Sequence, residues 1–274
     1  MLLKSVLISL FIGLALLVSI ICVGQRSIVF PRHLLPSVPK VPDVPPATEQ
    51  IWLQRGQFSV EAWFMVGRGR TPDSPGPVVI FAHGNGEVID SAAMSLQFYV
   101  NRGVSVAALE YRGYGRSGGS PSQDGIVRDG VALYDQIVER ADVDARAVIF
   151  HGRSLGGGVV CGMARERQPR AMILESTFTS LRARASEMWI PGILVRDPFD
   201  NLGVVRELNI PILIMHGVHD EIISVSHGTA LADAARDGEL HLWPTGHNDL
   251  ASHLERYQGA VIRFLDRLGA LRLH

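Results

Sequence analysis

The chain has 274 residues, enough for one large domain or two small ones. Its formal net charge is −1, and its 26 basic and 27 acidic residues are scattered along the chain, so the charge pattern gives no reason to expect nucleic acid as a partner. The two cysteines, Cys22 and Cys161, lie in unlike contexts, and no CxxC pattern indicates a metal or redox centre.

The N-terminus carries an uncharged apolar run from Ser5 to Gly24. Such a run is long enough to cross about 30 Å of hydrocarbon as a helix. A cleaved signal peptide is the alternative, but its apolar core is usually only about 7–15 residues long, and no good cleavage site precedes Gln25. We therefore expect a single-pass membrane anchor over residues 1–25. The flanking basic residues weakly favour a cytoplasmic location for the rest of the chain.

A proline-rich stretch, Pro31 to Pro46, follows this run. Its six prolines disfavour a helix and predict an extended, semi-rigid stem over residues 26–50. The pattern then becomes regular, which predicts one folded domain over residues 51–274.

Strand and helix patterns alternate through this domain. An alternating segment at residues 57–66 predicts a strand. Short apolar runs typical of strands buried on both faces occupy residues 78–82, 104–110, 147–151, 171–175 and 211–216. Helical patterns occupy residues 88–102, 124–140, 155–168, 224–236 and 248–268. The alternation predicts an α/β fold with a mostly parallel central sheet and helices on both faces. Ligands of such sheets bind at the carboxyl ends of the strands, so the residues that follow each strand are the candidates for a site.

Two glycine-rich segments follow predicted strands. In "FAHGNGE", residues 81–87, the glycines leave backbone N–H groups open to a bound oxygen, although a plain strand-to-helix turn is an equal alternative. In "EYRGYGRSGGS", residues 110–120, Gly113, Gly115 and Gly118 have the spacing of a dinucleotide fingerprint. No helix pattern begins at those glycines, so we interpret the segment as a loop that borders a pocket.

The third segment is "VIFHGRSLGGG", residues 148–158, where Ser154 stands between Gly152 and Gly156. Gly-x-Ser-x-Gly between a strand and a helix is typical of a nucleophile elbow, a strained turn that exposes the serine hydroxyl at the edge of the sheet. The two glycines let neighbouring backbone approach closely. The N–H of Leu155, at the start of the helix, can face a developing oxyanion.

A serine hydroxyl needs a base, and the elbow motif expects its partners in the order serine, acid, histidine. Asp220 follows the strand over residues 211–216, and His247 follows a predicted edge strand and precedes the last helix. Each residue alone has an ordinary explanation as a turn, cap or surface residue. His216 and His219 leave a metal site open as an alternative, but no further ligands occur at a recognisable spacing.

Together these motifs resemble the α/β-hydrolase superfamily, and within it the membrane-anchored branch of BEM46-like proteins and the α/β-hydrolase-domain 13 and 17 types. The resemblance covers residues 57–268 and rests on "HGNG", "YRGYGRSGGSPS", "GRSLGG", "ESTFTSL", "HGVHDEIIS" and "GHNDL". It implies an α/β-hydrolase fold with a short lid, and no metal or cofactor.

The resemblance also implies the roles of particular residues. Ser154 would be the nucleophile, Asp220 the acid and His247 the general base, with the backbone N–H groups of Asn85 and Leu155 as the oxyanion hole. Two positions depart from the pattern. Glu110 stands where many relatives have Asp, and Glu87 follows "NG", where relatives often have a smaller or apolar residue.

The resulting hypothesis is a serine hydrolase that cleaves an acyl ester or thioester through an acyl-enzyme. "MWIPGILVRDPF", residues 188–199, is apolar enough to line an acyl pocket or to lie near a membrane, although ordinary packing over the sheet would also explain it. The partners expected are a small or lipid-like acyl substrate and, through the anchor, a membrane. A serine aminopeptidase-like peptidase and a non-catalytic, membrane-tethered binding protein on a hydrolase scaffold are the alternatives.

Overall fold

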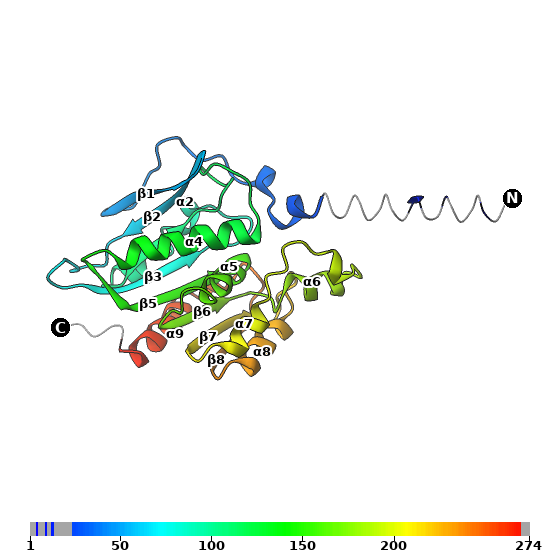
Figure 1. Cartoon of the computed structure of the whole chain (residues 1–274). Coiled ribbons are helices and arrows are strands. Elements are labelled where there is room, and N and C mark those ends of the chain that lie inside the picture. The colour runs from blue at the N-terminus through cyan, green and yellow to red at the C-terminus, as the bar shows by residue number, and fades with distance from the viewer. Residues whose placement is uncertain (1–3, 5–8, 10–11, 14–23, 270–274) are drawn as a thin grey trace.

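The structure is a computed structural model that describes residues 24–269 and, before them, residues 4, 9, 12 and 13. One eight-stranded sheet runs through it in the order β1-β2-β4-β3-β5-β6-β7-β8 (Figure 1). β1 pairs antiparallel with β2, and β2 pairs antiparallel with β4, whereas all later neighbours are parallel. The strands are β1 Thr48–Arg55, β2 Phe58–Met65, β3 Gly76–Ala82, β4 Ser105–Leu109, β5 Val143–Arg153, β6 Ala171–Glu175, β7 Pro211–Gly217 and β8 Asp237–Trp243. The predicted α/β fold with a mostly parallel sheet is confirmed.

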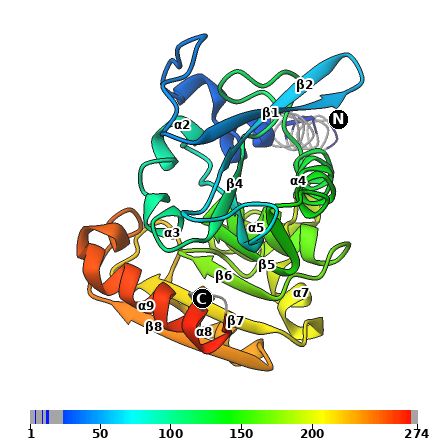
Figure 2. The same cartoon turned by 90° about the vertical axis from the view of Figure 1, so that its left-hand side faces the viewer.

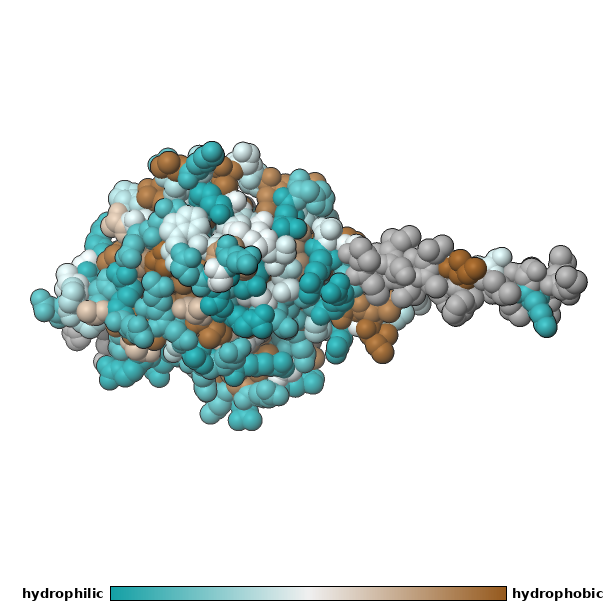
Figure 3. Space-filling model, turned by 45° about the horizontal axis from the view of Figure 1, so that its top comes forward, coloured by the Kyte–Doolittle hydropathy of each residue, from teal (hydrophilic) through white to brown (hydrophobic). Residues whose placement is uncertain are grey.

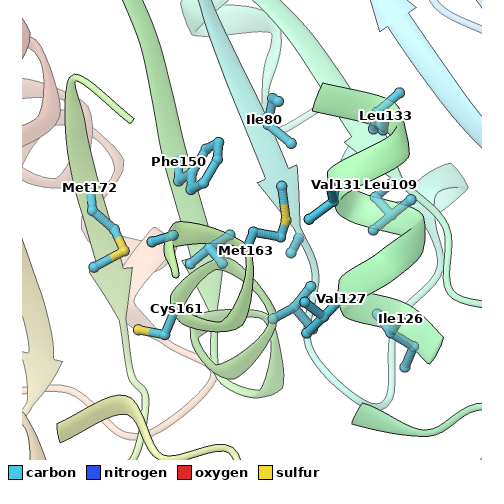
Figure 4. Close-up of a cluster of buried hydrophobic side chains, with 14 of the residues drawn as sticks. Ile80, Leu109, Ile126, Val127, Val131, Leu133, Phe150, Cys161, Met163 and Met172 are labelled. Carbon is cyan, nitrogen blue, oxygen red and sulfur yellow. The ribbon is translucent and has the colours of Figure 1, made fainter. Parts of the chain in front are cut away.

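Helices cover both faces of this sheet (Figure 2). The described helices are α2 Ile89–Ala92, α3 Gln97–Val100, α4 Gln123–Val138, α5 Leu155–Ala164, α6 Leu181–Glu187, α7 Asn201–Glu207, α8 Val225–Ala234 and α9 Leu254–Arg267, with short 3₁₀ turns η1 Arg32–Leu34, η2 Gly192–Leu194 and η3 Leu250–His253. Residues 24–29 are also helical, including the first residues of the segment predicted as an extended stem. One apolar core packs side chains of α4, α5, α7 and α8 on the sheet, and the other packs α2, α3 and α9 on the opposite face. Figure 4 shows part of the first core, where Ile80, Leu109 and Phe150 of the sheet meet Val127 of α4 and Met163 of α5. Burial of alternate strand residues on two faces explains why the strands read as continuous apolar runs.

The helix predicted over residues 88–102 is wrong in one respect, because the structure divides it into α2 and α3. Ser91 Oγ donates to the Val88 carbonyl, and Ser95 Oγ donates to the Ala92 carbonyl at 2.7 Å. Serine side chains that bond to nearby backbone compete with helical hydrogen bonds and favour turns. Strand β1 and helices α6 and α7 had no counterpart in the prediction.

The predicted anchor over residues 1–25 lies mostly outside the described residues. Among the residues that the structure describes, no helix is both long and apolar enough to cross a bilayer.

The segment predicted as a stem packs on the domain at its start. Phe30 is buried, and its ring lies 6.4 Å from that of Phe199. Arg26 forms an ion pair with Asp197, and a 3₁₀ turn forms at Arg32–Leu34 despite the neighbouring prolines. A 3₁₀ turn needs few hydrogen bonds, so Pro31 before it and Pro36 after it are tolerated. Residues 26–35 are therefore part of the packed structure, and the three-part division of the chain stays a prediction.

Candidate active site

The carboxyl ends of β3, β5, β7 and β8 bring four loops together. Parallel strands end at the same edge of a sheet, so the residues that follow them meet there. Asn85 follows β3, Ser154 follows β5, Asp220 follows β7 and His247 follows β8. The structure therefore gathers these residues at one edge, although Ser154 and His247 alone are separated by 93 positions in the chain.

Ser154 occupies a strained turn between β5 and α5. Its φ is 51° and its ψ is −115°, a left-handed backbone conformation that residues with a Cβ rarely adopt. Two hydrogen bonds hold it there: Ser154 N–H donates to the Glu175 carbonyl at 2.8 Å, and Thr177 Oγ1 donates to the Ser154 carbonyl at 2.7 Å. Strain of this kind persists only where surrounding contacts enforce it, and it concentrates at functional sites.

The glycines on either side of Ser154 are required by close backbone contacts. A Cβ on Gly152 would overlap the Gly156 carbonyl, and a Cβ on Gly156 would overlap the Ala82 carbonyl. These neighbours are backbone atoms of β3 and α5, which cannot rotate away as a side chain can. The elbow therefore depends on glycine at both positions.

We expect Gly156→Ala to destabilise the protein by about 1–3 kcal/mol or more, because overpacking against backbone forces the strand and helix apart. The same displacement moves Ser154 away from His247, so activity should fall further than the folded fraction does. Gly86→Ala is the matched control, since a Cβ there meets nothing within 4 Å. Urea unfolding and activity measured on both variants check this; equal behaviour of the two would contradict the packing argument.

Ser154, His247 and Asp220 form a continuous hydrogen-bonded line. His247 Nε2 lies 3.1 Å from Ser154 Oγ, and His247 Nδ1 lies 2.7 Å from Asp220 Oδ2. Burial opposes ionisation of Asp220, but hydrogen bonds from His216, His247 and the Ile223 N–H lower the pKa of its carboxyl well below the ordinary value. An ionised carboxylate only accepts hydrogen bonds. Nδ1 of His247 therefore carries the proton, and Nε2 is free to accept from the Ser154 hydroxyl.

Within the described residues, the backbone N–H groups of Asn85 and Leu155 form no hydrogen bond with the rest of the protein. Leu155 is the first residue of α5, where the N–H groups of a helix have no partner inside the helix and the macrodipole favours negative charge. A side-chain hydrogen bond helps to fix the loop that carries Asn85, because Tyr114 Oη donates to the Asn85 carbonyl at 3.1 Å. Leu155 N–H, next to Ser154, can therefore donate to an oxygen bound there, and the pairing of Asn85 and Leu155 as an oxyanion hole stays a prediction.

A buried ion pair supports the Asn85 loop. His83 lies with Nε2 at 2.8 Å from Glu110 Oε1 and with Nδ1 at 2.8 Å from the Gly84 carbonyl. Both ring nitrogens thus face acceptors, which only the imidazolium can satisfy. Burial lowers the pKa of His83, but the charge and hydrogen bond of Glu110 outweigh this and raise it above the ordinary value. Tyr111 Oη donates to the His83 carbonyl at 2.5 Å and completes the support.

Glu87 and Arg153 form a second link that the sequence pattern did not reveal. Glu87 Oε2 accepts from the Gly84 N–H at 2.9 Å, and its Oε1 pairs with the Arg153 guanidinium. Arg153 also donates to Asn248 Oδ1 at 3.4 Å and lies 3.4 Å from Glu175 Oε1. The three loops that carry Asn85, Ser154 and His247 are therefore connected through one guanidinium. The one sequence feature that pointed to this connection was Glu87 itself, which stands where a smaller or apolar residue was expected.

The alternative of a metal site at His216 and His219 finds no support in the described residues, which contain no group of three or more metal-ligating side chains in a suitable arrangement. His216 Nε2 instead lies 2.8 Å from the Ile223 carbonyl and 3.2 Å from Asp220 Oδ2. The glycine-rich loop that begins at Gly113 carries no helix, since α4 begins only at Gln123. Gly113, Ser120 and Pro121 line one side of a cavity.

The fold and this site together define an α/β-hydrolase, and comparison with known proteins agrees. Residues 73–196 match the family model described as serine aminopeptidase, S33. The α/β hydrolase domain-containing protein WAV2 of Arabidopsis thaliana is 31% identical over 93% of this chain and 90% of its own length. The protein YfhR of Escherichia coli (strain K12), itself uncharacterized, is 30% identical over 75% of this chain and 76% of its own length. The chain belongs to the α/β-hydrolase superfamily, while the narrower BEM46-like branch stays a prediction.

Solved structures share the fold at lower sequence identity. An α/β-hydrolase from Vibrio vulnificus has a TM-score of 0.67 at 21% identity and covers 80% of this chain and 82% of its own. An esterase from Pyrococcus furiosus has a TM-score of 0.68 at 17% identity, with 85% and 96% covered. Esterase 2 of Thermogutta terrifontis with propionate bound also has a TM-score of 0.68 at 17% identity, with 84% and 97% covered.

Proposed function

We propose that this protein is a serine hydrolase that cleaves an acyl ester or thioester. One observation carries the proposal: Ser154, in a left-handed turn, lies 3.1 Å from His247, whose other ring nitrogen lies 2.7 Å from Asp220. Serine becomes a good nucleophile only when a base removes its proton, and the base works best when a third group fixes its tautomer. Both conditions can be met by His247 and Asp220 as they are placed.

The proposed reaction proceeds in two steps. His247 Nε2 takes the Ser154 proton while Oγ bonds to the acyl carbon, and the Asn85 and Leu155 N–H groups stabilise the resulting oxyanion. His247 then protonates the leaving alkoxide or thiolate as its bond to carbon breaks, which leaves an acyl-enzyme. In the second step, water loses a proton to His247, attacks the same carbon and releases the acid, and the proton returns to Ser154. Asp220 stays ionised throughout and stabilises the imidazolium.

Esterase activity of the structural neighbours supports the ester proposal by analogy of fold alone. The family model, described as a serine aminopeptidase, supports a second candidate, cleavage of an aminoacyl amide. Both reactions use the same acyl-enzyme chemistry. The leaving group distinguishes them, because an amine must be protonated before it departs, whereas a thiolate or phenolate need not be.

The test is labelling of the full-length chain by a fluorophosphonate probe, with Ser154→Ala and His247→Ala beside the wild type. We expect labelling of the wild type alone. Equal labelling of Ser154→Ala would assign the reactive serine elsewhere, and no labelling of a folded wild type would favour a non-catalytic binding protein. A panel of p-nitrophenyl esters, acyl-thioesters and aminoacyl p-nitroanilides then separates the two candidate reactions.

The link through Arg153 leads to a prediction about Glu87. Glu87→Gln removes the charge that pairs with Arg153 and weakens the acceptor for the Gly84 N–H. We expect kcat for an uncharged ester to fall about tenfold to a hundredfold, because small displacements of an oxyanion donor have effects of this size. Glu166→Gln, at an exposed position after α5, is the control and should retain wild-type kcat. An unchanged kcat in Glu87→Gln would mean that the loop keeps its position without this ion pair.

We also propose that the uncharged run from Ser5 to Gly24 anchors the protein in a membrane. Its length and lack of charge support the proposal. Extraction of membranes with alkaline carbonate provides the test: an anchored chain stays in the pellet, whereas a peripheral or secreted chain appears in the supernatant.

A further inference from the structure

Large apolar side chains are exposed on the segment after β6 that carries α6 and η2 (residues 179–199, here called the lid) and on the N-terminal segment bound to it (residues 25–35). The most exposed are Trp189 at 96%, Ile193 at 90%, Ile28 at 76%, Leu34 at 74% and Met188 at 62%. Single exposed apolar residues are ordinary, but a group on one part of a surface indicates an interaction site. We call these five side chains the apolar platform. Their exposure excludes the simple explanation that residues 188–199 only pack over the sheet.

The two parts of the platform are joined by specific contacts. The Gln25 side chain donates to the Leu194 carbonyl at 3.0 Å and accepts from the Arg196 N–H at 2.8 Å. Arg26 pairs with Asp197. The segment that carries Ile28 is thus bound to the loop that carries Ile193, and Figure 1 shows this segment and α6 at the same end of the molecule. In Figure 3, exposed apolar side chains appear at this end of the domain.

The position of the platform in the chain indicates what covers it. The uncharged run from Ser5 to Gly24 ends one residue before Gln25, which is bound to the lid. If that run enters a bilayer, the lid lies directly at the surface of the same bilayer. An aqueous location would leave Trp189 and Ile193 in water, whereas Trp is enriched where membrane meets water.

Charge near the platform also fits a lipid surface. A cavity beside the N-terminal segment is lined by Arg26, Arg32 and His33. Arg182 and Arg196 are exposed on the lid itself, and the lid carboxylates of Glu187 and Asp197 pair with Arg184 and Arg26. Exposed cations next to exposed apolar side chains are typical of surfaces that lie in the headgroup region, with apolar groups inserted below the phosphates.

We propose that the apolar platform inserts into the interface of the bilayer that the N-terminal run enters. The lid follows the carboxyl end of β6, and Ser154 follows the carboxyl end of the neighbouring strand β5. Insertion therefore turns the edge of the sheet that carries Ser154 toward the lipid. The substrate class that this arrangement favours is an acyl chain that is itself held in the membrane. The inference rests on the proposed anchor and does not depend on whether the serine is reactive.

The experiment measures quenching of tryptophan fluorescence by brominated phosphatidylcholine in vesicles that also contain phosphatidylserine. The full-length chain is reconstituted as wild type, Trp189→Phe and Trp52→Phe. The sequence has four tryptophans, and Trp52, on β1 and 40% exposed, serves as the matched control. We expect brominated lipid to quench the wild type and Trp52→Phe equally, and Trp189→Phe to lose most of that quenching.

Three other results would overturn the proposal. Equal quenching of Trp189→Phe and wild type, in protein that floats with the vesicles, would place the lid in water and leave the anchor intact. Failure to float would overturn both the anchor and the docking of the lid. A blue-shifted Trp189 emission in the absence of lipid would indicate that a second copy of the chain covers the platform instead. Fluorophosphonate labelling of the same samples reports separately on the serine.

Discussion

Ser154→Ala is expected to lower kcat by a factor on the order of 10⁴–10⁶, with little change in KM, since the nucleophile is used only after the substrate is bound. His247→Ala should lower kcat by a similar factor, because Ser154 then keeps its proton. Asp220→Asn should lower it by about 10⁴, because an amide can hold His247 in the wrong tautomer. Steady-state kinetics on a p-nitrophenyl ester measure all three effects.

The combined variant gives the sharper test of this mechanism. When two residues act as one catalytic unit, replacing the first already removes the rate contribution of the second. The double variant Ser154→Ala with His247→Ala should therefore have a kcat no lower than that of either single variant. Ser226→Ala, at an exposed position on α8, is the control for serine replacement in general and should keep wild-type kcat. Additive losses in the double variant would show that Ser154 and His247 act in separate ways, despite their separation of 3.1 Å.

Glu110→Gln is expected to lower the free energy of unfolding by about 3–5 kcal/mol, because it leaves the buried His83 imidazolium without its counter-charge. Glu110 is fully buried, and its Oε1 accepts from His83 Nε2 and from the Tyr111 N–H at 2.9 Å, while Oε2 accepts from the Ile89 N–H at 3.2 Å. A glutamine offers one acceptor oxygen in place of two. Urea unfolding of the full-length chain in mild detergent measures the loss.

The pH dependence of this loss identifies its cause. The pKa of His83 is raised in the folded state, so the ion pair contributes its full stability below the unfolded pKa of about 6.5. That contribution disappears as the pH rises through the folded pKa. The difference in unfolding free energy between wild type and Glu110→Gln should therefore be largest near pH 6 and should shrink in alkaline solution.

Glu110→Asp is the conservative control, since it retains the charge and shortens the side chain by one methylene. We expect it to lose less stability than Glu110→Gln and to keep the same direction of pH dependence. A difference between Glu110→Gln and wild type that does not change with pH would mean that His83 is neutral in the folded protein. The Asn85 loop begins next to His83, so both variants should also lower kcat.

Much of the fold was predictable because its sheet is buried on both faces. Apolar runs at residues 171–175 and 211–216 correspond to β6 and β7 almost residue for residue, since a strand covered on two sides carries few polar residues. β1 was missed for the opposite reason. It lies at an edge of the sheet, and only Ile51 and Leu53 of its residues are buried, so its sequence has a weak apolar pattern.

Local sequence also indicated which residues gather at the site. The elbow around Ser154 needs two glycines within a short stretch, and Asp220 and His247 follow strands that are themselves easy to recognise. Their arrangement in one line, with distances of 3.1 and 2.7 Å, then follows from parallel strands that end at one edge.

The sequence by itself thus determined the α/β sheet, the strained serine turn and the chain order of the residues at the edge, because each depends on short-range patterns of apolar residues and glycines. Only the tertiary structure decided that Arg153 connects Glu87, Asn248 and Glu175, that Glu110 is the counter-ion of His83, and that Trp189 faces outward. These contacts join residues from different strands and loops. The sequence position of a charged side chain does not indicate which residue it will pair with. Whether a side chain of the lid is exposed depends on whether the core beneath the lid has room for it.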